Sequence, residues 1–200
     1  MSAALADQEA VDPVLSHNGP WTIEDIEALP DCGNHTRYEL LTPGVLTVSP
    51  APGTLHQRAS RRLACLLDPA VSAAGIDAEV LEAVNVVLPD GRLAIPDVLI
   101  VEGKFADANP TKYPPEAVIA VIEIVSPGSE PQDRMVKPQV YAKADIGVYW
   151  RFELEPKPHI LAYELRRGRF VHVDTAPAGE RTTIPVPFPV EVDPLELTRR

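Results

Sequence analysis

The sequence predicts one α/β domain. Two hundred residues with 45% hydrophobic content can bury one sizeable core, and no shift in composition marks a second domain. The apolar run Ala117–Val125 is short, rich in β-branched residues and ended by Ser126-Pro127-Gly128, which is typical of a strand buried on both faces. Residues 1–20 are small, polar and acidic, so we expect a flexible tail before a single domain at residues 21–200.

Charge and composition exclude several classes of protein. A net charge of -11 and a pI near 4.9 argue against a broad basic surface that coats nucleic acid, so a polyanion would need a local basic patch or metal ions. No apolar run approaches the roughly 18 residues of a membrane span. The N-terminus lacks a basic region followed by an apolar one, and we expect a cytoplasmic protein. Cys32 and Cys65 lie far apart in dissimilar contexts, one in a polar turn and one on an apolar helix face, which indicates neither a disulfide framework nor a zinc cluster.

Short runs of β-branched and aromatic residues, bounded by turn residues, predict the other strands. They are Arg37–Leu41 and Val45–Val48 around a turn at 42–44, Glu79–Glu82 and Asn85–Leu88 before a turn at 89–91, Ile95–Val101, Gly147–Phe152, and a hairpin of Ile160–Leu165 with Arg169–Asp174. Residues 104–115 are predicted as a loop and Ile184–Pro189 as an extended edge segment.

Helices are predicted at four places. Thr22 caps a short helix at Ile23–Leu29, which Pro30-Asp31-Cys32-Gly33 ends, and Pro194–Thr198 is a last helical turn. Thr54-Leu55-His56-Gln57 has capping-box spacing, so a helix should run from Thr54 to about Ala74. Asp133–Ala144 is helical, and Pro138 requires either a start near Met135 or a break beside Lys137.

Two groups of polar side chains on the long helix allow alternative interpretations. Its inner face should hold Leu55, Ala59, Leu63 and Leu66, which places Arg58, Arg61 and Arg62 on the other side. A solvated face is the favoured interpretation of these arginines, and phosphate contact is the alternative. His56 in the first turn is interpreted as a surface or packing residue, slightly ahead of a substrate contact.

Glu123 lies in the middle of the buried strand 117–125. Burying an unpartnered carboxylate costs at least several kcal/mol, so Glu123 must be protonated, ion-paired or bound to metal. Two further carboxylates, Glu39 and Asp97, also lie within or at the start of apolar strands. Taken singly, Asp97 could be a turn residue after Pro96, and Glu39 could be a charge on an edge strand that pairs with Arg37 or a neighbour. Clustered carboxylates suit Mg²⁺ or Mn²⁺, and together they predict metal-assisted phosphodiester cleavage.

These residues resemble the motifs of known nucleases. Pro96-Asp97, Glu123 and a nearby lysine resemble the PD-(D/E)XK nuclease signature. A longer arrangement is similar to the Uma-type family of bacterial endonucleases over roughly Trp21 to Leu165. It comprises Arg37-Tyr-Glu-Leu40, Ser49-Pro-Ala-Pro52 with His56-Gln57, Pro96-Asp-Val98, Glu123-Ile-Val-Ser-Pro127, Asp133-Arg134, Lys137, Tyr141 and Gly147-Val-Tyr-Trp150. The resemblance implies the restriction-endonuclease-like fold, in which helices flank a central mixed β-sheet, here with an additional β-hairpin region at the C-terminus. It also implies DNA nuclease activity and a divalent metal.

The resemblance also assigns site residues. Asp97 and Glu123 take the metal-ligand positions, Glu39 the additional acidic position, and the backbone carbonyl of Ile124 completes the set. The superfamily motif places lysine two residues after the glutamate, where this chain has Val125.

Lys137 is the candidate replacement, as in the family's pattern, and its alternative role is a helical pair with Asp133. In this hypothesis a metal-activated water attacks the phosphodiester, and Lys137 orients or deprotonates the water or neutralises the transition state. Tyr141 and Gln57, with His56 and Asp133, are weaker candidates for contacts to the ligands or the substrate.

Two further expectations concern partners. A homodimer is expected from Trp150, Phe152 and Tyr163 in late β segments, because two-fold pairing would place two sites for cutting opposite DNA strands. The competing class is a catalytically silent module that keeps the nuclease fold and uses its acidic surface to bind a protein.

Overall fold

The computed structural model describes residues 12–30 and 36–200. Most of the predicted tail, and the predicted turn at 31–33 with Cys32, therefore lie outside the described residues. Residues 12–20 contact the domain: Pro13–Ser16 form α1, His17 stacks on Trp21 with ring centroids 3.8 Å apart, and the Trp21 N–H donates to the Gly44 carbonyl. The following helix, α2 (Ile23–Glu27), begins at Thr22 with a capping box to Asp25, as predicted for its N-terminus.

A six-stranded mixed sheet forms the centre of the molecule. Its strands are, in order, β11 (Arg169–Pro177), β10 (His159–Arg166), β9 (Val148–Glu153), β8 (Val118–Val125), β6 (Val98–Glu102) and β3 (Ala78–Glu82). Only β8 and β9 run parallel, and the other neighbours are antiparallel. β8 lies inside the sheet with every residue except Ile119 buried, which confirms the predicted central strand. The predicted C-terminal hairpin forms the β10–β11 edge of this sheet.

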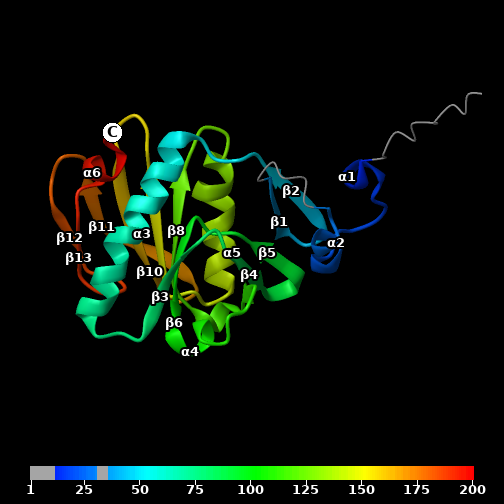
Figure 1. Ribbon diagram of the computed structural model, residues 1–200, viewed down its shortest axis with the longest axis horizontal. Helices are drawn as coiled ribbons and strands as arrows, with labels where there is room; N and C mark the ends of the chain where they lie inside the picture. Colours follow the sequence, from blue (N-terminus) through cyan, green and yellow to red (C-terminus); the bar gives the residue numbers. More distant parts are fainter. Residues whose placement is uncertain (1–11, 31–35) are drawn as a thin grey trace, which may run out of the picture.

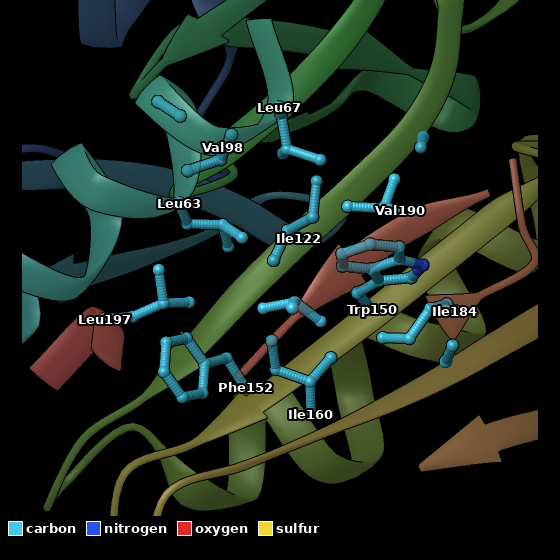
Figure 2. Packing of buried hydrophobic residues seen from close by; sticks show 14 of the residues in the cluster. Leu63, Leu67, Val98, Ile122, Trp150, Phe152, Ile160, Ile184, Val190 and Leu197 are labelled. Atoms are coloured by element: carbon cyan, nitrogen blue, oxygen red, sulfur yellow. The ribbon is translucent and has the colours of Figure 1, made fainter. Parts of the chain in front are cut away.

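One face of the sheet is covered by the long helix α3 (Thr54–Ala74), the C-terminal helix α6 (Pro194–Thr198) and a two-stranded sheet of β12 (Thr182–Ile184) and β13 (Val190–Val192). Figure 2 shows Leu63 and Leu67 of α3 directed toward Ile122 of β8. The predicted edge segment at 184–189 is mainly the connection between β12 and β13.

The opposite face is covered by α5 (Lys137–Lys143) and a second sheet of five strands. The second sheet has the order β2 (Val45–Ser49), β1 (Arg37–Thr42), β5 (Arg92–Ala94), β4 (Asn85–Leu88) and β7 (Lys112–Tyr113). The β1–β2 hairpin and α2 lie beyond α5 at one end of the long axis (Figure 1). Glu123 has the same strand parity as Val121 on β8, so its side chain faces this second layer.

Three predictions of local structure are wrong in detail. The strand at 95–101 begins at Val98, after Asp97. The loop at 104–115 contains α4 (Gly103–Ala106) and β7, and short 3₁₀ turns occur at Pro89–Gly91 and Pro115–Ala117. α3 begins at Thr54, but Gly53 is its cap residue and no side chain caps it.

The inner face of α3 is rotated from the predicted one, toward His56, Ser60 and Leu67. Its buried residues are His56, Ala59, Ser60, Leu63, Ala64, Leu67 and Val71, while Leu55 is 38% exposed and Cys65 is exposed. Arg58 donates to the Thr198 carbonyl, and Arg62 donates to the carbonyls of Glu196 and Arg199. These two arginines therefore fasten the C-terminus, and only Arg61 matches the predicted solvated face. No helix in the described part of the chain is long and apolar enough to cross a membrane.

Candidate functional site

Four elements bring five ionisable side chains to one pocket of about 470 Å³. Glu39 comes from β1, Asp97 from the residue before β6, Glu123 from β8, and Asp133 and Lys137 from the start of the helical segment after β8. All five are buried, with Glu123 at 0% exposed and Lys137 at 5%. Burial of this many charges is costly unless they compensate one another, so their contacts decide what the pocket can do.

Lys137 lies at the centre of the acidic side chains. Its Nζ is 3.1 Å from Glu123 Oε2, 3.3 Å from Glu39 Oε1 and 3.6 Å from Asp133 Oδ1. The predicted pair with Asp133 is therefore the longest of three contacts.

Local helix geometry makes this placement possible. Gln132–Val136 form a π-helical turn, and α5 begins at Lys137 with Pro138 in its first turn, where no backbone donor is needed. Of the two alternatives for Pro138, the structure matches a change of helix beside Lys137. Val125, where the superfamily motif places lysine, is buried and apolar.

Asp97 is held by three donors. Arg37 Nη1 donates to Oδ1 at 2.5 Å, the Ile124 N–H donates to Oδ2 at 2.8 Å, and His56 Nε2 lies 3.0 Å from Oδ2. Two single-residue interpretations are corrected by these contacts: Asp97 is more than a turn residue, and Arg37 pairs with Asp97 rather than with Glu39. His56 is buried, which contradicts the surface position and leaves the packing position of its interpretation.

Among the described residues, Glu123 and Glu39 each have one donor besides Lys137. Tyr141 Oη donates to Glu123 Oε1 at 2.5 Å, and the Ile95 N–H donates to Glu39 Oε1 at 2.8 Å. Tyr141 thus lies on the far side of Glu123 from the pocket, since it does not line the pocket wall. Burial first, and then the charge of Glu123, raise the pKa of Tyr141 well above its ordinary value, so Tyr141 remains a hydrogen-bond donor.

The pKa values of the pocket side chains are set by burial and by their mutual contacts. Burial raises the pKa of Glu123 well above its ordinary value, against the opposing effect of the Lys137 ammonium. Burial likewise raises the pKa of Asp133. Burial would also raise the pKa of Asp97, but the His56 hydrogen bond and the charge of Arg37 hold that pKa below its ordinary value. Burial alone would lower the pKa of Lys137, but Glu123, Glu39 and Asp133 together raise it, so Lys137 carries its charge at neutral pH.

A hard divalent cation fits this donor set. Four buried carboxylates, Glu39, Asp97, Glu123 and Asp133, line the pocket with two permanent cations, Arg37 and Lys137, so there are more carboxylates than these two basic side chains can pair with. Carboxylate oxygens and the nearby Ile124 carbonyl are ligands that Mg²⁺ and Mn²⁺ prefer.

The carboxylates are not arranged around a vacant ion position, because the Lys137 ammonium lies among them. Within residues 12–30 and 36–200, no three Asp, Glu, His or Cys side chains are grouped so as to hold an ion. The Lys137 ammonium occupies the space between Glu39, Glu123 and Asp133. An ion bound by these carboxylates would therefore displace the ammonium.

The remaining predicted residues divide into two groups. His56, Ile124 and Asp133 line the pocket, whereas Gln57 is exposed, donates to the Pro52 carbonyl and does not line the pocket. Arg37 was missed as a site residue, although strand residues two apart share a face and Arg37 is two before Glu39.

Comparisons with known proteins agree with this fold. A family model, Uma2, described as "putative restriction endonuclease", matches residues 23–198. A crystal structure of "a putative nuclease belonging to DUF820" from Anabaena variabilis superposes with a TM-score of 0.68 at 15% sequence identity. The match covers 90% of this chain and 100% of the other, and at this identity it shows a shared fold. A search of curated proteins gave no match.

Proposed function

Because the chain belongs to the Uma2 family of putative restriction endonucleases, we propose that it is an endodeoxyribonuclease that needs Mg²⁺ or Mn²⁺ to hydrolyse DNA phosphodiester bonds. The observation that carries the proposal is the excess of buried carboxylates around one lysine in an accessible pocket. An apolar cluster of similar volume would often be as stable as such a charge cluster or more so, which favours a chemical role over a structural one.

The proposed cation ligands are Glu39, Asp97, Glu123 and the Ile124 carbonyl. The N–H and C=O of a strand residue point to the same edge, and the Ile124 N–H already bonds Asp97, so its carbonyl lies on that side. A bound ion would lower the pKa of the attacking water and would neutralise charge on the phosphoryl oxygens.

The surrounding side chains have positioning roles in this proposal. Arg37 and His56 fix the orientation of Asp97, and Tyr141 fixes that of Glu123. Lys137 is charged, so it acts as a hydrogen-bond donor to the phosphoryl group or the water and not as the base. Of the three roles left open for Lys137 by the sequence, charge stabilisation and orientation are the ones that this environment favours.

The competing proposal is a catalytically silent module that binds a protein through its acidic surface. The central position of Lys137 favours it, because the ammonium already compensates part of the acidic cluster without any ion. The net charge of -11 is also compatible with it. The homodimer is not part of either proposal, since Trp150 and Phe152 fill the core and Tyr163 packs against the second apolar cluster.

The nuclease proposal is tested with purified protein and labelled DNA in manganese, magnesium or chelator. We expect fragments with either metal and none with chelator. Asp97→Asn should lower the rate about a hundredfold or more, because it removes a charged ligand. Asp90→Asn is the matched control, since Asp90 is an exposed turn carboxylate that should not affect the rate. Equal cleavage by the parent and by a folded Asp97→Asn protein would rule out this site as the source of the activity.

A further inference from the structure

One segment of the pocket lining carries no Asp, Glu, Lys or Arg. The sequence contains no Asp, Glu, Lys or Arg from Leu40 to Gln57, and this segment supplies β2, the following loop and the start of α3. Val48, Pro50, Pro52 and Leu55 line the pocket from this segment, and we call these four residues the neutral wall. Val48 is 50% and Leu55 38% exposed, so apolar surface faces solvent beside the buried charges.

Two buried polar atoms in residues that line the same pocket lack partners. In the described part of the chain, neither His56 Nδ1 nor Gln132 Oε1 has a hydrogen-bond partner. Buried polar atoms without partners are uncommon in folded proteins. Polar and apolar side chains thus line the same pocket, which suits a ligand that has both an apolar face and hydrogen-bonding groups, as a nucleobase does.

The pocket is poorly suited to a DNA duplex. Arg37 and Lys137 are the basic side chains among its described lining residues, and both already contact carboxylates. Glu155 adds another negative charge to the lining. Binding of a duplex rests on several Lys or Arg contacts to phosphates, whereas one strand can be held by contacts to its exposed bases.

We propose, on the premise of the nuclease function above, that the substrate is single-stranded or unpaired DNA. The neutral wall packs against a base next to the scissile phosphate, which reaches the carboxylates of the same pocket. A volume of about 470 Å³ lies in the range of small-molecule sites and can hold one nucleotide. A base in a duplex would first have to unpair and unstack to make the same contact, which lowers the rate on duplex DNA.

The first arm of the test compares one labelled oligonucleotide alone and annealed to its complement, in manganese. We expect cleavage of the single strand to be about tenfold faster or more. A duplex that is cut as fast as the single strand overturns this inference and leaves the nuclease proposal standing. Cutting of neither substrate overturns both.

The second arm tests the neutral wall with a double variant, Val48→Ser/Leu55→Ser. We expect KM for the single strand to rise about fivefold with little change in kcat, because an apolar binding contact is lost. The matched control is Val45→Ser/Ile76→Ser, since Val45 is 54% and Ile76 37% exposed and neither lines the pocket. Fluorescence anisotropy with labelled single strands and catalytically inactive Glu123→Gln protein supplies the same comparison without cleavage. Equal KM for the two double variants overturns the assignment of the wall.

Discussion

Replacing Lys137 by Met should lower the DNA cleavage rate about a hundredfold or more and should also destabilise the metal-free protein. The ammonium contacts Glu123, Glu39 and Asp133, and its removal leaves these buried carboxylates without their common cation. Loss of one partner from a buried ion pair costs about 3–5 kcal/mol. For a domain of this size that loss corresponds to a fall in Tm on the order of 10 °C. Thermal unfolding in chelator and single-turnover cleavage in manganese measure the two effects.

Manganese should act differently on the Lys137→Met protein and on the parent. The variant has lost the cation that competes for Glu39 and Glu123, so its affinity for manganese should be unchanged or slightly higher. The added metal should then recover part of the lost Tm, because an ion that binds only the folded state stabilises it.

Two further variants separate the causes of the Lys137→Met effects. Lys143→Met makes the same substitution at an exposed position of the same helix, and its stability should stay within about 0.5 kcal/mol of the parent. Val125→Lys in the Lys137→Met background returns an ammonium to the strand position two after Glu123, on the same face, and should restore part of the cleavage. A Lys137→Met protein that cleaves as fast as the parent would reduce Lys137 to a structural counterion.

Replacing Glu123 by Gln should abolish metal binding and cleavage while leaving the metal-free protein as stable as the parent or more stable. Burial and the nearby Asp97, Asp133 and Glu39 oppose ionisation of Glu123, and a neutral side chain of the same shape removes that cost. Relief of about 1 kcal/mol would raise Tm by about 2–4 °C. Glutamine can still accept a hydrogen bond from Lys137 and donate one to Tyr141, so the local contacts are retained.

The stability gain should depend on pH. Because the pKa of Glu123 is higher in the folded than in the unfolded state, folding takes up a proton, and the stability of the parent falls as pH rises above about 4.5 toward the folded pKa. The advantage of Glu123→Gln should therefore be absent in acid and grow toward neutral pH. Urea unfolding of both proteins across this range measures the difference.

Glu153→Gln is the matched control for the sign of the stability change expected in Glu123→Gln. Glu153 is also buried, on the adjacent strand β9, but Arg134 and Arg151 outweigh the effect of burial and lower its pKa. Its contribution to stability is present above the unfolded pKa and is lost as pH falls through the folded pKa. Glu153→Gln should thus destabilise the protein at neutral pH, where Glu123→Gln should not. An unfolded Glu123→Gln protein would contradict the assignment of Glu123 as a metal ligand.

The sequence predicted the features that depend on local pattern. The apolar run with Glu123 in it is β8, and the capping residues of α2 and the start of α3 were placed correctly. The buried face of α3 was not, because apolar periodicity along one helix could not show that the polar side chains of His56 and Ser60 are buried, where they contact Asp97 and Glu82.

Contacts between distant residues were the main part of the site that could not be predicted. His56 and Asp97 are far apart in the sequence, and their contact depends on α3 packing beside the start of β6. The central position of Lys137 depends on a π-helical turn, for which the sequence around Pro138 gave two alternatives. Arg37 shares a strand face with Glu39, but its partner, Asp97, could be identified only from the fold.

The central claim is that the buried carboxylates and Lys137 form a binding site for a divalent cation and are not a structural ion-pair cluster. Calorimetric titration of manganese into the parent and into Glu123→Gln tests this claim most directly. The account predicts saturable binding by the parent, displaced by magnesium, and loss of that binding in the folded variant. Absence of binding to the parent, or equal binding to both proteins, would contradict it.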